Sequence, residues 1–484
     1  MSNSYVGAGI LNVITESLYD NPIVVFREYV QNSMDSILRE YDTGNREIKI
    51  WFCENNLYFL DNGSGIATEN FFDEMRTIGG SGKKRQKDIG YKGIGRLSGV
   101  PYCRKLYFLN IEDYSNKEIQ LYTISGELYE KIKNNQLDSE MSFHKLMDEI
   151  GECIPSFDLE KNEMISNAID KYEKMLTESN SGFLVILNDI SSVLENTIND
   201  NDFFTNLQWL LPVDFDKDLY CSEEKELFEE LTTKNDENGN TPIKFCKISY
   251  NDKNIYRPIK KSFFRDYVCK NNFKYAVGFH SFNGNKIYID KNNDFTGIRI
   301  YIDNMLLCDE NELLQNLDNY GLLSHTLNGQ LQSVRGIGAM IYINDKVNIS
   351  ANARRTFIEV TDDDSLEFLN LLAEFVNTIY DTRYALSNYA SAKDKQDQSI
   401  EKLQKLRIYA LNCLRKLAKE EIKLTVDDEY SKFDDLSVID KKKVFKKKIS
   451  KKINDKIKEY LKTITTFNAE SVYKDFIEWL SKNQ

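Results

Sequence analysis

Three polar residues near the N-terminus have the types and the spacing to do chemistry together. Glu28, Asn32 and Asp35 stand at positions i, i+4 and i+7 of the segment NPIVVFREYVQNSMDSI, residues 21–37. In a helix this spacing places all three on one face. Carboxylates can accept protons and an amide oxygen can bind a hard cation, so this face predicts a binding or catalytic site. The alternative is an ordinary solvated helix face.

The element that must position them is a helix over the same segment. Phe26, Val30, Met34 and Ile37 recur at helical spacing, away from the polar face, and the Asn-Pro pair at 21–22 supplies a cap and a first-turn proline. We therefore expect an amphipathic helix with its apolar stripe in a core.

A glycine-containing stretch, DNGSGI at 61–66, follows a predicted strand pair, IKIWFCENNLYFL at 48–60. Asp61 is expected at the end of a strand, and Gly63 and Gly65 leave room for a flat ligand against the backbone. The alternative is an Asn-Gly hairpin turn. The next residues, ATENFFDEMRTIGG, have the pattern of a helix and not of a returning strand, which argues against the hairpin.

A second stretch, GYKGIGRLSG at 90–99, could bring backbone amides close to phosphates. It is not part of a P-loop, because the nearby TIGGSGKK has Thr77 in place of the first glycine and Lys84 in place of Ser or Thr. It is not a dinucleotide fingerprint either, because Ser98 stands where the last glycine is required.

Taken together and in this order, the three motifs resemble the GHKL ATPase superfamily, which includes heat-shock chaperones of the ninety-kilodalton type, MutL-type repair proteins, gyrase-type subunits and histidine kinases. The first hundred residues carry the resemblance, which is strongest to the heat-shock group. The family motifs E-x-x-x-N-x-x-D, D-x-G-x-G and G-x-x-G-x-G are matched in turn by the segments at 28–35, 61–65 and 90–95. One departure is Phe183, which stands after Gly182 where the family usually has Thr.

The resemblance implies ATP and Mg²⁺ as cofactors, and ATP hydrolysis as the reaction. Glu28 is then the base that orients and deprotonates water, and Asn32 is the magnesium ligand. Asp61 accepts a hydrogen bond from the adenine amine, which discriminates against guanine. The other nucleotide-binding residues that the resemblance implies are Asp35, Gly63, Gly65, Ile66, Lys83, Gly90, Lys92, Gly93 and Gly95.

An arginine pair lies much further along the chain, in KVNISANARRTFIEV at 346–360. Heat-shock proteins have a middle-domain loop of the form N-x-x-R that reaches the γ-phosphate, and Asn352 and Arg355 resemble it. Arg354 is a neighbour that could substitute for Arg355. A guanidinium suits this catalytic role because it grips phosphate oxygens in two places. The alternative is a surface turn.

The expected fold class is α+β, in three parts. Residues 1–195 form an α/β sandwich ATP-binding domain, with a lid over about 67–99 and a helical insertion over about 125–180. Residues 196–391 form a transducer-like α+β domain, and 392–484 a helical region. FLVILNDI, at 183–190, reads as the buried strand that closes the first domain. The strands expected in the second domain are KFCKISY, YAVGFHSF, NKIYID, GIRIYID and AMIYIND.

The composition sets limits on the class of protein. The chain has 484 residues, of which 41% are hydrophobic and 29% charged, which suits a soluble multidomain protein. Its eight cysteines form no C-x-x-C pair, which disfavours a disulfide scaffold and structural zinc. No leader pattern and no apolar run of roughly 18 residues is visible, so we expect a cytoplasmic protein without membrane contact.

Two functions remain open. The first is a homodimeric, ATP-driven clamp of heat-shock type, which closes through its N-terminal domains on an unknown client. The second is a nucleotide-gated clamp on DNA of MutL or MORC type, which could act within a bacterial defence system. The net charge of −13 excludes a protein that coats nucleic acid with its whole surface, but the lysine-rich segment 441–461 could bind DNA locally. That segment could equally be a packed helix with solvated lysines.

Two further members of the superfamily are disfavoured. A histidine kinase carries its phosphoacceptor histidine upstream of the ATP domain, and here none of the three histidines, His144, His280 and His325, precedes Glu28. A gyrase subunit would need a cleavage-domain signature, and we find none.

Overall fold

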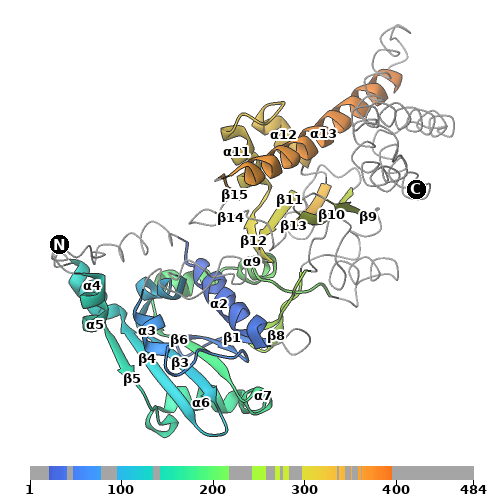
Figure 1. Ribbon diagram of the computed structural model, residues 1–484. Coiled ribbons are helices and arrows are strands. Elements are labelled where there is room, and N and C mark those ends of the chain that lie inside the picture. Colours follow the sequence, from blue (N-terminus) through green and yellow to red (C-terminus); the bar gives the residue numbers. More distant parts are fainter. Residues whose placement is uncertain are drawn as a thin grey trace, which may run out of the picture. The chain divides into compact units, whose positions relative to one another are not determined.

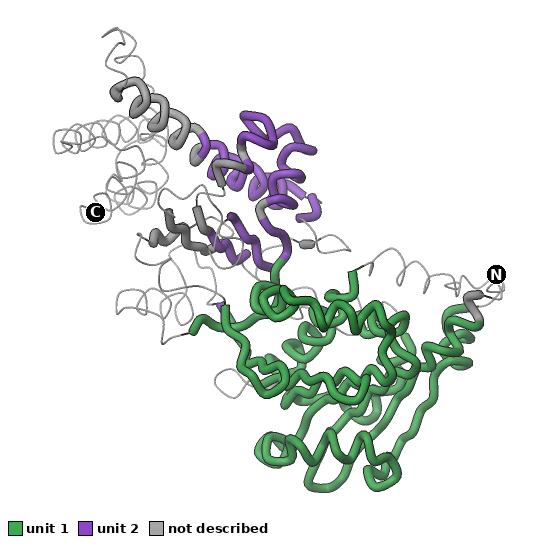
Figure 2. The backbone as a smooth tube through the Cα atoms, turned by 180° about the vertical axis from the view of Figure 1, so that it is seen from behind, with its two compact units in different colours: residues 1–216, 244–258, 303–306 green, residues 217–243, 259–302, 307–484 purple. Residues whose placement is uncertain are grey.

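The protein is described by a computed structural model, and its described residues divide into two compact units (Figure 2). The first unit comprises residues 1–216, 244–258 and 303–306, and the second comprises 217–243, 259–302 and 307–484. The residues that the structure describes are 21–40, 47–77, 95–134, 142–216, 243–257, 268–272, 276–282, 297–302, 304–334, 337–343, 350–351, 358–360 and 362–394.

The first unit is built on an eight-stranded sheet with the order β5-β4-β3-β6-β2-β1-β7-β8 (Figure 1). Its strands are β1 (Glu47–Cys53), β2 (Asn56–Asp61), β3 (Cys103–Asp113), β4 (Glu118–Ser125), β5 (Gly151–Ile154), β6 (Gly182–Ile190), β7 (Lys247–Tyr250) and β8 (Lys253–Asn254). The predicted strand pair is confirmed, because β1 and β2 are antiparallel and joined by a turn in which Glu54 and Asn55 have positive φ. The predicted strand FLVILNDI is β6, between β3 and β2.

Alternating residues of this sheet enter two separate cores, one on each face. In β2, Leu57 and Phe59 lie in the first core, and Tyr58 and Leu60 lie in the second. This is the period-two pattern of a strand that is covered on both sides. The sheet therefore needs a helical layer on each face.

Helix α2 (Val24–Glu40) covers the first face, and the predicted apolar stripe is confirmed: Phe26, Val30, Met34 and Ile37 are all fully buried. Helices α6 (Glu163–Lys171) and α7 (Glu173–Ser179) cover the second face. They come from the segment 125–180 that we expected to be a helical insertion. The other helices of this unit are α3 (Phe71–Arg76), α4 (Gly126–Asn134), α5 (Phe143–Ile150), α8 (Ser192–Ile198) and α9 (Phe203–Leu210).

The placement of KFCKISY in the second domain was wrong. Its last four residues form β7, which pairs in parallel with β1 of the first sheet, Ile48 opposite Ile248. Ile248 is buried in the first core. The pattern of a short apolar strand predicts that it pairs but not with which sheet, because the partner lies about 200 residues away in the sequence. The domain limits at 195 and 391 stay predictions.

The second unit is also mixed α and β. Its five-stranded sheet has the order β12-β11-β13-β10-β9, and Ile300 of β11, Ile341 of β13 and Leu372 of α13 share its core. The strands are β9 (Val268–Asn272), β10 (Ala276–Phe282), β11 (Gly297–Ile302), β12 (Met305–Cys308) and β13 (Ile337–Ile343), with a separate pair β14 (Ser350–Ala351) and β15 (Ile358–Glu359). The helices are α11 (Glu310–Asn319), α12 (Leu327–Val334) and α13 (Asp363–Asp394).

Some predicted features lie outside the described residues. They are the strand NKIYID, the arginine pair Arg354 and Arg355 with Asn352, and the tail from residue 395 onward. Among the described residues, no helix is both long enough and apolar enough to cross a membrane.

Candidate functional site

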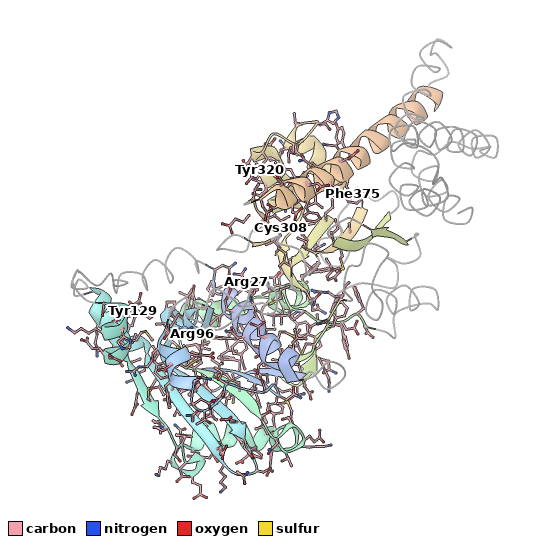
Figure 3. The ribbon with its side chains drawn as sticks, in the orientation of Figure 1. Arg27, Arg96, Tyr129, Cys308, Tyr320 and Phe375 are labelled. Carbon is pink, nitrogen blue, oxygen red and sulfur yellow. The ribbon has the colours of Figure 1, made fainter. Side chains whose placement is uncertain are left out.

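The polar face of α2 is turned toward the protein and not toward solvent. Asp35 is only 3% exposed, and Glu28 and Asn32 are partly buried. Arg27, labelled in Figure 3, pairs with its neighbour: its Nη2 and Nε atoms both lie 3.3 Å from Oε1 of Glu28. The face is therefore not fully solvated, since Asp35 is buried and Glu28 lies against another segment at Gly95.

Glu28 lies directly against Gly95, the last glycine of the third motif. A Cβ atom added to Gly95 would lie 2.3 Å from Oε2 of Glu28, so any larger residue would displace the carboxylate. The two oxygens of Glu28 thus have different surroundings, since Oε1 pairs with Arg27 and Oε2 faces Gly95. The structure joins the first and third motifs at this point. The other residues of the third motif, Gly90, Lys92 and Gly93, and also Lys83, lie outside the described residues.

The turn that begins at Gly95 is fixed by two side chains that the sequence did not indicate. The Tyr29 hydroxyl donates to the carbonyl of Arg96 at 3.1 Å and accepts from the N–H of Gly99 at 3.1 Å. Arg96, which is labelled in Figure 3, donates from Nε to the carbonyl of Met75 at 3.2 Å and from Nη2 to the carbonyl of Thr77. The turn is thereby attached both to α2 and to the end of α3.

Asp61 is a buried acid at the end of β2, as predicted, and is only 2% exposed. It accepts a hydrogen bond from the N–H of Gly63 at 2.9 Å. The side chain of Ser33 and the backbone N–H of Phe183 also donate to it. Burial nevertheless raises the pKa of the Asp61 carboxyl to about 7, since these neutral donors offset the loss of solvent only in part. A buried acid with a raised pKa is typical of a functional site.

The glycines of DNGSGI let the loop pack closely on the protein itself. A Cβ on Gly63 would lie 2.3 Å from Oγ of Ser36 and 2.7 Å from the backbone nitrogen of Ile37. Gly65 has φ +65°, and a Cβ there would lie 2.7 Å from Oδ1 of Asn110. Both positions therefore require glycine without any ligand. The close approach of a nucleotide to this loop stays a prediction.

Asn110 of β3 is another residue that sequence reasoning missed. Its Oδ1 accepts from the N–H of Ile66 at 2.9 Å, and its Nδ2 donates to the carbonyl of Ile66 at 2.6 Å. Gln120 of β4 accepts from Asn110 at 3.2 Å and donates to the carbonyl of Thr68 at 3.2 Å. Two buried amides thus hold the loop after β2 as a neighbouring strand would. An Asn within a strand carries no local signal of this role.

Phe183, which stands where the family usually has Thr, lies in the sheet beside Asp61. Phe183 lies opposite Asp61 in the ladder between β6 and β2, and it supplies a backbone N–H to the carboxyl. The hydroxyl that donates to Asp61 comes from Ser33 of α2. Ser181, just before Gly182, donates its hydroxyl to the carbonyl of Gly63 at 2.9 Å. Hydroxyl contacts around this loop therefore do not require a Thr at position 183.

Helix α2 is thus the common wall of the site. Glu28 faces the Gly95 turn, Ser33 donates to Asp61, and the Ser36 hydroxyl accepts from the N–H of Gly65 at 3.1 Å. Glu28 and Ser36 are eight residues apart, which corresponds to about 12 Å along a helix axis. One helix thus contacts both glycine-containing segments and the buried acid Asp61.

Comparison with known proteins agrees with this geometry. Residues 21–152 match the family model described as histidine kinase-, DNA gyrase B- and HSP90-like ATPase. This range contains α2, the loop after β2 and the Gly95 turn. This part of the chain is a GHKL-type ATPase domain. The GHKL domain family binds ATP, and the resemblance to the heat-shock group is supported by the relative described next.

One relative is the chaperone protein HtpG of Acinetobacter baylyi, which is 30% identical over 124 residues. The matched part covers 20% of this chain and 19% of that protein. The chain therefore matches about a fifth of the relative's length.

The donor set of the GHKL domain is compatible with a nucleotide-bound magnesium ion. Within the described part of the chain, no group of three or more His, Cys, Asp or Glu residues could hold a metal ion by itself. Magnesium bound to a nucleotide does not need such a group, because it keeps several waters and takes one or two protein oxygens besides the phosphates. The partly buried Asn32, one helical turn from Glu28, offers one such oxygen.

Proposed function

We propose that this protein binds ATP in its GHKL domain, hydrolyses it with magnesium, and uses the cycle to drive a conformational clamp of heat-shock type. One observation carries the proposal: α2 contacts both glycine-containing loops, one next to a buried acid and one next to a carboxylate that can serve as a base. A site for hydrolysis needs both, because one end must hold the nucleotide and the other must act on its phosphates.

Asp61 is the residue proposed to select adenine. Its carboxylate form accepts a hydrogen bond from the exocyclic amine, whereas guanine presents a carbonyl oxygen at that position, which offers no donor to the carboxylate. Because burial raises its pKa, the Asp61 carboxyl carries a negative charge only at a cost in free energy. A ligand donor would lower that cost. Asp35, Gly63, Gly65 and Ile66 are proposed to line the same end of the site.

Glu28 is proposed to act at the phosphate end. With Oε1 held by Arg27, Oε2 is the oxygen that faces the Gly95 turn. This supports the proposal that Oε2 orients and deprotonates a water molecule at a phosphate bound near that turn. The backbone of Gly95 and the residues of the third motif, Gly90, Lys92 and Gly93, are proposed to contact the phosphates, together with Lys83. Asn32 would hold the magnesium ion that neutralises phosphate charge.

The rest of the cycle is proposed from the resemblance alone. We propose that the chain forms a homodimer whose N-terminal domains meet when ATP is bound, and that Arg355 or its neighbour Arg354 reaches the γ-phosphate. The client and the cytoplasmic location stay predictions.

ATP turnover by the purified full-length chain tests the proposal. We expect turnover with magnesium, none with EDTA, and turnover slowed by roughly 10²–10⁴-fold in Glu28→Ala. Absence of magnesium-dependent turnover in the folded wild type would overturn the ATPase. A second arm adds double-stranded DNA at low and high salt. Salt-sensitive stimulation by DNA would instead favour a DNA clamp of MutL or MORC type.

A further inference from the structure

Tyr29 follows Glu28 in the helix and points in a different direction, since successive helical residues are rotated by about 100°. It is 2% exposed and packs in the first core, with its ring 5.2 Å from that of Phe59. A buried aromatic ring alone would be ordinary core packing. The hydroxyl at its end is what sets this residue apart.

The hydroxyl bridges the Gly95 turn. It donates to the carbonyl of Arg96 and accepts from the N–H of Gly99, so it uses its donor and an acceptor on two ends of the same short segment. Burial raises the pKa of Tyr29 far above its ordinary value, so the hydroxyl keeps its proton over the whole working range of pH. A Cβ on Gly99 would lie 2.4 Å from the same oxygen, which shows how closely the turn packs on Tyr29.

Two successive residues of α2 therefore contact one turn. Glu28 meets Gly95, and Tyr29 binds the residues that follow it. Because the helix backbone fixes the two side chains relative to each other, a turn that shifted on Tyr29 would also shift relative to Oε2 of Glu28. Oε2 lies 2.3 Å from the place that a Cβ of Gly95 would take, so a shift of the turn in that direction would press on the carboxylate.

We propose that Tyr29 is a positioning residue that sets the distance between the base Glu28 and the phosphate-binding turn. The proposal rests on the proposed ATPase function and assigns it a residue that the motifs do not contain. It separates two roles: the Tyr29 hydroxyl affects the rate of hydrolysis, whereas the adenine end, held by β2 and β3, determines affinity.

Tyr29→Phe removes only the hydroxyl and keeps the ring. The matched control is Tyr122→Phe: Tyr122 is fully buried in the same core, and its hydroxyl has no hydrogen-bond partner among the described residues. We expect Tyr29→Phe to lower kcat by roughly 10- to 100-fold, because an ångström-scale misplacement can cost on the order of 100-fold. The Kd for a non-hydrolysable ATP analogue should stay within about twofold, and Tyr122→Phe should resemble the wild type in both.

A second measurement needs no nucleotide. Hydrogen exchange of the Gly99 amide in the free protein should be faster in Tyr29→Phe than in the wild type and in Tyr122→Phe, because that amide has lost its acceptor. This readout reports the attachment of the turn directly.

The outcomes are distinguishable. If the wild type turns over ATP and Tyr29→Phe keeps the wild-type kcat, the inference about Tyr29 is wrong, and the proposed ATPase function is retained. If kcat, analogue affinity and thermal stability of Tyr29→Phe fall together, the hydroxyl is merely structural and the inference is also wrong. If the wild type itself shows no turnover, the proposed function fails, and the inference fails with it.

Discussion

Two short glycine-containing segments rest on the same helix, and they are attached to the protein in different ways. The loop at 61–66 is an extension of the sheet: it begins at the last residue of β2, and Asn110 of β3 pairs with Ile66 through two hydrogen bonds. The turn at 95–99 is attached through side chains, one hydroxyl from α2 and the guanidinium of Arg96.

We infer from this difference that the two segments have different roles, one in binding the base and one in the reaction at the phosphates. A loop that continues a hydrogen-bonded strand and is also held by side chains of α2 and β3 suits the recognition of a rigid base. A turn attached by a few side chains suits the end at which the chemistry occurs, because a small displacement there changes the rate before it changes the affinity. Substitutions in the two segments should then have different effects on Kd, kcat and stability.

The largest effect is expected at Asp61. Asp61→Asn should abolish ATP binding, because the new amide can present its own donor to the adenine amine, and a buried donor left facing another donor is costly. Isothermal titration calorimetry on the folded variant measures this. Unchanged affinity would remove Asp61 from the site and end the assignment of 61–66 as the base-binding loop.

Glu28 should affect the rate and not the binding. Glu28→Ala is expected to slow hydrolysis by roughly 10²–10⁴-fold with ATP affinity retained. Asn32→Ala, four residues on along α2, is the contrasting variant: it should weaken magnesium-dependent binding, because it removes an oxygen ligand. Single-turnover rates and analogue titrations with and without magnesium separate the two. If both variants bind and turn over alike, α2 is not the catalytic element.

A pair of glycine substitutions tests the comparison itself. The new methyl group of Gly95→Ala would press on the end of the flexible Glu28 side chain. That of Gly63→Ala would press on the Ser36 hydroxyl and also on the backbone nitrogen of Ile37, which cannot move as easily. We expect Gly95→Ala to lower kcat by roughly tenfold with little change in stability. Gly63→Ala should destabilise the fold by about 1–3 kcal/mol. Urea unfolding and steady-state kinetics on both variants measure these effects. The reverse pattern would contradict the different roles inferred for the two segments.

The smallest effect is a dependence of stability on pH. The folded pKa of Asp61, about 7, lies above the value of about 4 for an unfolded aspartate, so between these values the folded state holds a proton that the unfolded state releases. Stability of the ligand-free protein should therefore fall as pH rises from about 5 to 7 and level off above that. Relative to Asp61→Asn, the slope should be ~1 kcal/mol per pH unit. Equal slopes in urea titrations of the two proteins would show that burial does not perturb this acid.

Local pattern was enough to predict several elements correctly. The apolar stripe of α2, the antiparallel pair β1 and β2, the strand β6 and the position of Asp61 at a strand end all follow from residues close together in the sequence. The periods of 3.6 and 2 that reveal such elements are properties of the local backbone. The order of the motifs likewise indicated the GHKL domain before any contact between them was known.

Contacts between distant segments could be known only from the tertiary structure. In the fold, Gly95 lies against Glu28, and the turn that follows Gly95 is bonded to Tyr29. Asn110 pairs with Ile66, and β7 belongs to the first sheet. The fold also buries Asp61 and so raises its pKa. The physical reason is that packing joins residues through space, and a side chain carries no sign in its own sequence neighbourhood of which distant backbone it will meet. From the sequence alone, Tyr29 is expected to be one more aromatic residue of the core. Only the fold shows that its hydroxyl bonds the backbone of Arg96 and Gly99.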